Sequence, residues 1–181
     1  MVGNIPNLLT LTRILLLPFF AAALVYEKYG YALIIFVSAA MTDLFDGYIA
    51  RVRNQTTYLG SILDPVADKF FLLTSFIIMS YAGLIPKWLT ITVISRDLIV
   101  ITGSIILYLV IHNLKIETSI MGKIASAGQF ILVGLVLLSR NINEEMHVPM
   151  VFLVIIAVLT AVSGLHYVIK GLKMANPENT N

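Results

Sequence analysis

Cysteine is absent from this chain of 181 residues, and charged residues make up only 12% of it. Without cysteine there are no disulfide bonds and no thiol chemistry, and the redox compartment stays undetermined. A soluble domain carries about twice this share of charged residues, so the low charge and the 59% of hydrophobic residues indicate an integral membrane protein. A net charge of +2 and the lack of a basic cluster with interleaved aromatic residues argue against a nucleic-acid partner.

Long hydrophobic runs fill most of the sequence. Six of them are long enough to span a bilayer, and they lack the period-two alternation of half-buried β-strands. We therefore expect an all-α fold, a polytopic membrane protein with a six-transmembrane-helix bundle, formed by a single domain over residues 1–181. The six segments are Leu8–Tyr26, Tyr31–Ala50, Leu59–Ala82, Trp88–Ile111, Lys123–Ser139 and Pro149–Ile169.

The basic residues between these segments predict the orientation of the chain. Six spans place both termini on one side, and that side receives Arg51, Arg53, Lys115, Lys123, Lys170 and Lys173. The opposite side receives Lys28, Lys87 and Arg140, which acidic residues offset. Because positive charge accumulates on the cytoplasmic side, we expect cytoplasmic termini.

Four of the five aspartates fall between residues 43 and 68, in or beside apolar segments. Asp43 and Asp46 are three residues apart and Asp64 and Asp68 are four apart, so each pair shares one face of a helix. Four carboxylates around one point must hold protons or cations, and oxygen ligands suit hard divalent ions such as Mg²⁺, Mn²⁺ or Ca²⁺. For any single aspartate, snorkelling or helix capping is the competing interpretation.

The spacing of these residues forms a longer motif, D-x2-D-G-x2-A-R-x8-G-x3-D-x3-D, which begins at Asp43 and ends at Asp68. The motif has eight fixed residues within a 26-residue window, and all eight are present. In these residues the chain resembles the CDP-alcohol phosphatidyltransferase family. The resemblance covers most of the chain and is densest from about Thr42 to Asp97.

The resemblance implies an enzyme that transfers a phosphatidyl group from CDP-diacylglycerol to an alcohol and releases CMP. It implies a pair of Mg²⁺ or Mn²⁺ ions and a homodimer. Because the motif lies at the end of the second segment and the start of the third, on the side of both termini, we expect a cytoplasmic active site in a bacterial inner membrane. By this resemblance the general base is Asp68. The implied metal ligands are Asp43, Asp46, Asp64 and Asp68. The residues implied to line the CDP pocket are Asp43, Gly47, Ala50, Arg51, Gly60 and Asp64.

A second charged site, Arg96-Asp97, lies in the middle of the fourth segment. The resemblance makes Arg96 and Lys123 ligands for the phosphate of the acceptor alcohol, whereas a structural ion pair is the competing interpretation of Arg96. Family members that use glycerol 3-phosphate tend to carry two more cations, and the sequence here has Val100–Ser104 and Ala125 instead. Phosphatidylglycerol, which would give cardiolipin, is therefore the favoured acceptor, and glycerol 3-phosphate, as in a phosphatidylglycerophosphate synthase, is the alternative.

Two further interpretations stay open. Arg13, early in the first segment, either snorkels to lipid headgroups or lies beside the carboxylate cluster. Intramembrane aspartates also serve transporters and proton channels as proton relays, so a non-enzyme function is the competing class. If the protein is an enzyme, we expect CDP-diacylglycerol with Mn²⁺ to stabilise it against heat. If it is a transporter, we expect no response to this lipid.

Overall fold

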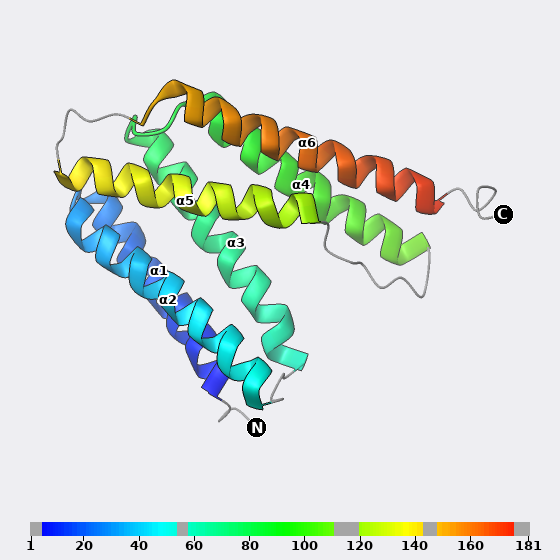
Figure 1. Ribbon diagram of the computed structural model, residues 1–181, viewed down its shortest axis with the longest axis horizontal. Helices are drawn as coiled ribbons and strands as arrows, with labels where there is room; N and C mark the ends of the chain where they lie inside the picture. The colour runs from blue at the N-terminus through cyan, green and yellow to red at the C-terminus, as the bar shows by residue number, and fades with distance from the viewer. Residues whose placement is uncertain (1–4, 54–57, 111–119, 143–147, 176–181) are drawn as a thin grey trace. The chain divides into compact units, whose positions relative to one another are not determined.

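The computed structural model describes the backbone of residues 5–53, 58–110, 120–142 and 148–175. It describes the side chains of residues 11–42, 67–106, 120–142 and 148–172. The described residues form helices and contain no strand, which confirms the all-α prediction. The helices are α1 (Ile5–Val25), α2 (Tyr29–Arg53), α3 (Tyr58–Tyr81), α4 (Lys87–Val110), α5 (Ile120–Ile142) and α6 (Met150–Ala175) (Figure 1).

Each predicted apolar segment corresponds to one helix. The ends agree within three residues, except that α6 continues to Ala175, six residues beyond the predicted Ile169. Among the described residues, three helical stretches are long and apolar enough to cross a membrane, namely Lys87–Ile106, Ile120–Ile142 and Met150–Leu172. Shorter apolar stretches cover Leu11–Val25 and Tyr29–Thr42. The bundle of six spans is thus only partly supported.

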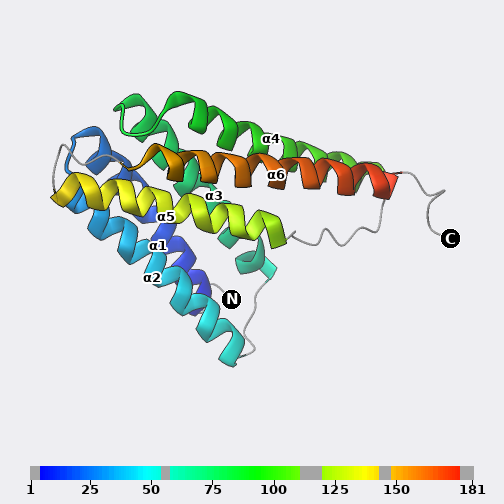
Figure 2. The ribbon, with the colours of Figure 1, turned by 45° about the horizontal axis from the view of Figure 1, so that its top comes forward.

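The chain packs as two compact units. Unit 1 contains residues 1–84 and 133–147, and unit 2 contains residues 85–132 and 148–181. Helix α5 contributes its C-terminal half to unit 1 and its N-terminal half to unit 2. In unit 1, α1 runs beside α2, and in unit 2, α4 runs beside α6 (Figures 1 and 2). The single domain expected from the sequence stays a prediction.

Aromatic packing joins the helices of unit 1. Phe20 of α1 stacks on Phe71 of α3 with ring centroids 4.5 Å apart. Phe36 of α2 lies 6.2 Å from Phe20 and 6.1 Å from Phe71. All three rings are buried. Offset contacts at these distances add to the dispersion energy of packing, so this cluster fixes α1, α2 and α3 against one another.

Two helices of unit 1 end in the same hydrogen-bonding pattern. At the end of α1, Lys28 N donates to Ala23 O and Glu27 N donates to Leu24 O; at the end of α3, Leu84 and Gly83 make the equivalent bonds. Both are Schellman motifs, which need a left-handed residue after the helix. The left-handed residue is Gly83 at φ 74° after α3, but Glu27 at φ 57° after α1.

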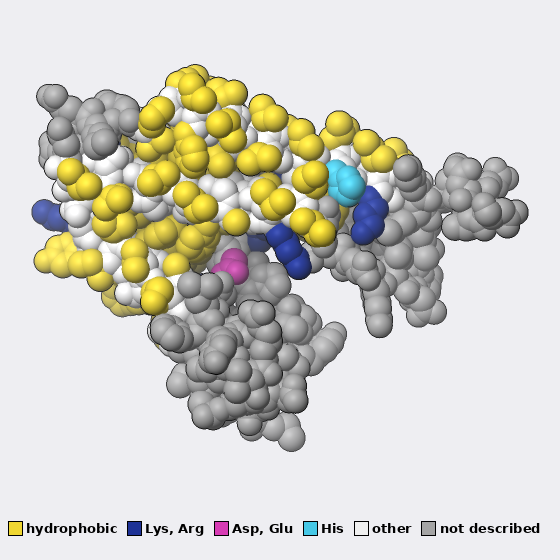
Figure 3. All heavy atoms as spheres, in the orientation of Figure 1, with side chains coloured by type: hydrophobic (Ala, Val, Ile, Leu, Met, Phe, Trp, Pro, Cys, Tyr) yellow, Lys and Arg dark blue, Asp and Glu magenta, His cyan; other side chains and the backbone are white. Residues whose placement is uncertain are grey.

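Large apolar side chains cover the surface of both units. Leu15, Phe19 and Val25 in unit 1 and Val151, Leu165 and Leu172 in unit 2 are each more than 60% exposed. Figure 3 shows hydrophobic side chains over most of the described part of the face in view. An apolar surface of this extent is what lipid chains contact in a membrane protein.

Candidate active site

The four motif aspartates lie on two helices of unit 1. Asp43 and Asp46 fall in the C-terminal half of α2, and Asp64 and Asp68 fall in α3. The side chain of Asp68 is described. Those of residues 43–66 lie outside the described side chains, so the gathering of four carboxylates stays a prediction. The same applies to the residues predicted to line the CDP pocket, Asp43, Gly47, Ala50, Arg51, Gly60 and Asp64.

An ion pair joins Asp68 to α1. Nη1 of Arg13 donates to Oδ1 of Asp68 at 2.5 Å, across 55 positions of sequence. The Arg13 side chain is 3% exposed, whereas that of Asp68 is 38% exposed. The guanidinium therefore holds one carboxylate oxygen from the protein side while part of Asp68 faces outward. This contact places Arg13 beside Asp68, one of the four predicted carboxylates, and so favours the second interpretation of Arg13, while the cluster itself stays a prediction.

The chemistry of the donor set fits a hard divalent cation. Carboxylate oxygens are the ligands that Mg²⁺ and Mn²⁺ prefer, and the partly exposed Asp68 offers such a group. Within the described residues, no three His, Cys, Asp or Glu side chains gather as a metal site. The three other predicted ligands, Asp43, Asp46 and Asp64, lie outside that search.

A second charged site lies in unit 2, around Arg96 of α4. Nη1 of Arg96 donates to Oδ1 of Asp97 at 2.7 Å, and Nη2 donates to Oγ of Ser163 on α6 at 2.9 Å. The guanidinium carbon lies 5.7 Å from the centroid of the Tyr167 ring, a cation–π distance. Arg96 is 4% exposed. The structural ion pair weighed for Arg96 and Asp97 therefore exists.

This guanidinium keeps a hydrogen-bond donor. The Nε atom of Arg96 is buried and has no hydrogen-bond acceptor among the described residues. A buried donor without an acceptor costs about 1–3 kcal/mol, and a phosphate oxygen is an acceptor that matches a guanidinium well. Arg96 therefore has both a structural partner, Asp97, and the chemistry of an anion ligand.

The start of α5 also reaches this site. A Cβ built on Gly122 would lie 2.9 Å from Nη2 of Arg96, so the first turn of α5 approaches the guanidinium. Lys123, the second predicted ligand for the acceptor, follows directly and is exposed. One further polar contact joins α5 and α6, where Nε2 of the buried Gln129 donates to Oγ1 of Thr160 at 3.0 Å.

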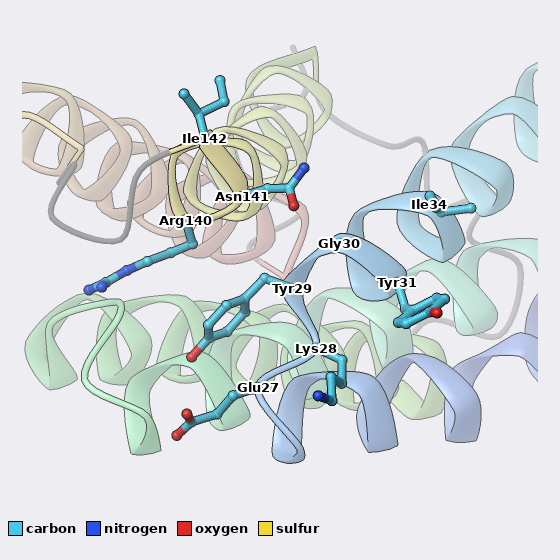
Figure 4. Close-up of a pocket in the computed structure, with 9 residues that line it drawn as sticks. All are labelled: Glu27, Lys28, Tyr29, Gly30, Tyr31, Ile34, Arg140, Asn141 and Ile142. Atoms are coloured by element: carbon cyan, nitrogen blue, oxygen red, sulfur yellow. The ribbon is translucent and has the colours of Figure 1, made fainter.

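A cavity of about 500 Å³ lies at another place in unit 1, between the α1–α2 turn and the end of α5. Glu27, Lys28 and Tyr29 line it from the turn, and Arg140 and Asn141 line it from α5 (Figure 4). Gly30 approaches Asn141 so closely that a Cβ would lie 3.1 Å from its side-chain oxygen. None of the residues predicted for catalysis or binding lines this cavity.

Sequence reasoning missed the residues of α6 that orient Arg96. Ser163 and Gly164 are adjacent, and Tyr167 lies one turn later. A signal was present, because small and polar residues that share a face of an apolar helix mark where another helix approaches. It did not indicate which residue of which helix would fill that face.

The helices of the described residues, their apolar surfaces and their buried arginines are those of an integral membrane protein, and comparison with known proteins identifies the family. The family model of CDP-alcohol phosphatidyltransferase matches residues 3–166. The chain therefore belongs to the CDP-alcohol phosphatidyltransferase family and is an enzyme of that class. Members of this family generally depend on divalent metal ions.

Curated relatives bear names of this same class. A CDP-diacylglycerol--glycerol-3-phosphate 3-phosphatidyltransferase of Aquifex aeolicus is 35% identical over 180 residues, covering 94% of this chain and 97% of the relative. The "Probable phosphatidylglycerophosphate synthase" of Mycobacterium tuberculosis is 33% identical over 180 residues, covering 95% of this chain and 83% of the relative. The human cardiolipin synthase (CMP-forming) is 45% identical over 101 residues, covering 55% of this chain and 34% of the relative.

Proposed function

We propose that this enzyme transfers the phosphatidyl group of CDP-diacylglycerol to phosphatidylglycerol, forming cardiolipin and CMP. The observation that carries this choice of acceptor is the ion pair between Arg96 and Asp97. Because Asp97 offsets the charge of Arg96 at 2.7 Å, the pair contributes little net positive charge. A phosphodiester with one negative charge suits such a site better than a phosphomonoester with two.

Glycerol 3-phosphate is the second candidate acceptor. It is supported by two relatives that align over almost the whole chain. The name of the Aquifex aeolicus relative specifies glycerol 3-phosphate, and that of the Mycobacterium tuberculosis relative specifies phosphatidylglycerophosphate synthesis. In that case Lys123 would join Arg96 at the phosphate and supply the second positive charge. The exposed position of Lys123 at the start of α5 is compatible with this role.

The reaction joins the acceptor hydroxyl oxygen to the phosphorus of the phosphatidyl group and breaks the bond from that phosphorus to the bridging oxygen of the diphosphate. Asp68 accepts the proton of the acceptor hydroxyl, while Arg13 holds its carboxylate through Oδ1. Arg96 binds the acceptor by its phosphate. CMP leaves with the bridging oxygen.

The residues that would hold Mg²⁺ or Mn²⁺ are Asp43, Asp46, Asp64 and Asp68. A pair of such ions supplies neutralisation of the negative charge on the diphosphate. We propose that Gly47, Ala50, Arg51 and Gly60 line the CDP pocket with Asp43 and Asp64. The small side chains permit a close approach of the nucleotide, and Arg51 suits a phosphate contact.

In the membrane, we propose six spans with cytoplasmic termini and a cytoplasmic active site, in a bacterial inner membrane and as a homodimer. The lack of native cysteine makes the orientation simple to test. Lys87→Cys should react with a membrane-impermeant maleimide added outside intact cells, and Lys170→Cys should react only after the cells are opened. The reverse pattern would overturn the orientation.

One assay tests the reaction and its acceptor. Purified protein receives labelled CDP-diacylglycerol and Mn²⁺ with either phosphatidylglycerol or glycerol 3-phosphate, and the lipid product is identified. We expect labelled cardiolipin, CMP in equal amount and no turnover after EDTA. Labelled phosphatidylglycerophosphate would establish the second candidate, and full turnover in EDTA would exclude the metal assignment.

A further inference from the structure

The side chain of Arg96 lies along two glycines of neighbouring helices. On α6, a Cβ built on Gly164 would lie 3.2 Å from Cγ of Arg96. On α5, a Cβ built on Gly122 would lie 2.9 Å from Nη2 of Arg96 and 3.0 Å from Cε2 of Tyr167. The aliphatic part of the arginine therefore passes over one glycine, and its guanidinium ends against the other.

Space, and not backbone conformation, accounts for glycine at these two positions. Both glycines lie inside helices, and neither has a positive φ. In a helix interior, glycine costs roughly 1 kcal/mol relative to alanine. A methyl group at Gly122, however, would come closer to Nη2 of Arg96 than real Cβ contacts do.

We infer that Gly122 is a positioning residue for Arg96. The missing side chain lets the guanidinium lie beside Tyr167 and donate to Ser163, and this fixes the place at which the acceptor phosphate binds. The inference rests on the proposed function, in which Arg96 binds that phosphate. Guanidinium recognition of phosphate depends on direction as well as charge, so a displaced guanidinium weakens acceptor binding although the charge remains.

The neighbours of Gly122 distinguish this role from ordinary helix packing. A methyl group there would meet the ends of two side chains, Arg96 and Tyr167, and no backbone of another helix within the nearest contacts. Gly128, on the same helix, is different, because its Cβ would meet Cδ1 of Ile156 at 2.8 Å. Alanine at position 122 should therefore move a guanidinium, whereas alanine at position 128 should disturb apolar packing.

The experiment measures kcat, the KM of the acceptor, the KM of CDP-diacylglycerol and the Tm of each variant in one lipid mixture. Phosphatidylglycerol and glycerol 3-phosphate are both used as acceptors. We expect Gly122→Ala to raise the acceptor KM on the order of tenfold, with the KM of CDP-diacylglycerol unchanged and the Tm not lowered.

Two matched variants serve as controls. Gly103→Ala adds a methyl group where no described residue lies within 4 Å, so kcat and both KM values should stay the same. Its Tm should rise slightly, because alanine is favoured over glycine inside a helix by roughly 1 kcal/mol. Gly128→Ala should lower the Tm without a selective change in the acceptor KM. An unchanged acceptor KM in Gly122→Ala, or an equal rise for both substrates, would overturn the inference.

A double-mutant cycle tests whether Gly122 acts through Arg96. In an Arg96→Lys background, Gly122→Ala should raise the acceptor KM less than it does in the unmodified enzyme, because the contacting Nη2 is gone. Equal effects in both backgrounds would contradict the inference. If Gly122→Ala does not fold, Tyr167→Leu removes the ring on the same guanidinium, and an unchanged acceptor KM in that variant would also contradict it.

The failure of this inference differs from the failure of the proposed function. If Arg96→Met leaves the acceptor KM unchanged, Arg96 does not bind the acceptor and the proposed function is wrong on that point. If Arg96→Met raises the acceptor KM and Gly122→Ala does not, Arg96 keeps its proposed role and only the positioning by Gly122 is wrong.

Discussion

Among the described residues, each unit of the protein contains a buried arginine paired with an aspartate, and the two pairs are built differently. Arg13 and Asp68 come from different helices, α1 and α3, and are 55 positions apart. Arg96 and Asp97 are neighbours on α4. The carboxylate is 38% exposed in the first pair and 10% exposed in the second.

This difference indicates which partner each pair presents to substrates. In unit 1 the guanidinium is buried and the carboxylate faces partly outward, as a base or a metal ligand requires. In unit 2 both partners are buried, and Ser163 and Tyr167 of α6 also contact the guanidinium. We therefore expect the first pair to act in the chemical step and the second in acceptor binding.

The largest expected effect concerns the chemical step. Asp68→Asn retains an oxygen that can accept from Arg13 but removes the base, so kcat should fall by about 10²–10⁴-fold. The Tm should fall as well, because the amide oxygen can still accept a hydrogen bond but no longer compensates the charge of the buried Arg13. Turnover and thermal unfolding of the purified variant measure both. A near-normal kcat in a folded variant would show that Asp68 is not the base and that its ion pair with Arg13 is only structural.

A smaller effect is expected for acceptor binding. Arg96→Met removes a charge-assisted contact worth about 1.5–3 kcal/mol, which corresponds to a rise of the acceptor KM by roughly 10–100-fold. The KM of CDP-diacylglycerol should stay the same. The control is Arg13→Met, which should lower kcat without this selective rise. If both variants changed kcat and the acceptor KM in the same way, the two ion pairs would not have separate roles in the chemical step and in acceptor binding.

The next effect concerns the choice of acceptor. Asp97→Asn removes the negative charge that offsets Arg96, so the site gains net positive charge. We expect kcat/KM for glycerol 3-phosphate to rise several-fold, on the order of 1 kcal/mol, relative to that for phosphatidylglycerol. Competition between the two acceptors in one reaction measures the ratio. A ratio that stays constant would show that Asp97 does not tune acceptor charge.

The smallest effect comes from a neutral polar pair. Gln129→Leu removes the hydrogen bond to Thr160 in the core of unit 2, and such bonds in membrane proteins contribute about 0.6 kcal/mol on average. The free energy of unfolding should fall by about 1 kcal/mol or less, with unchanged KM values. A large loss of activity would mean that a buried polar contact without charge also belongs to the site.

The helices could be predicted from the sequence because each long apolar run forms one helix, and the polar residues between the runs mark where each helix begins and ends. The pairing of Arg96 with Asp97 could be weighed from the sequence, because two opposite charges in the middle of an apolar segment need compensation. The partner of Arg13 was predictable only as a location near the carboxylates. Its contact with Asp68 depends on how α1 packs on α3 through Phe20 and Phe71.

The surroundings of Arg96 could not be predicted for a similar reason. The meeting of α4 with Ser163 and Tyr167 depends on the rotation of α6 about its own axis. Hydropathy does not determine that rotation when large apolar side chains such as Val158 and Leu165 face outward and suit lipid as well as protein. The role of Gly122 can be inferred only when the position of the Arg96 side chain is known.

The adjacency of Arg96 and Asp97 has a consequence for biogenesis. A single charged residue at the centre of a helix costs about 2.5–3.5 kcal/mol on translocon-based scales. Because both charges belong to one turn of α4, this helix can leave the translocon with its arginine already compensated. Helix α1 contains no acidic residue, and the carboxylate that pairs with Arg13 belongs to α3, so this ion pair forms only after α3 has been synthesised.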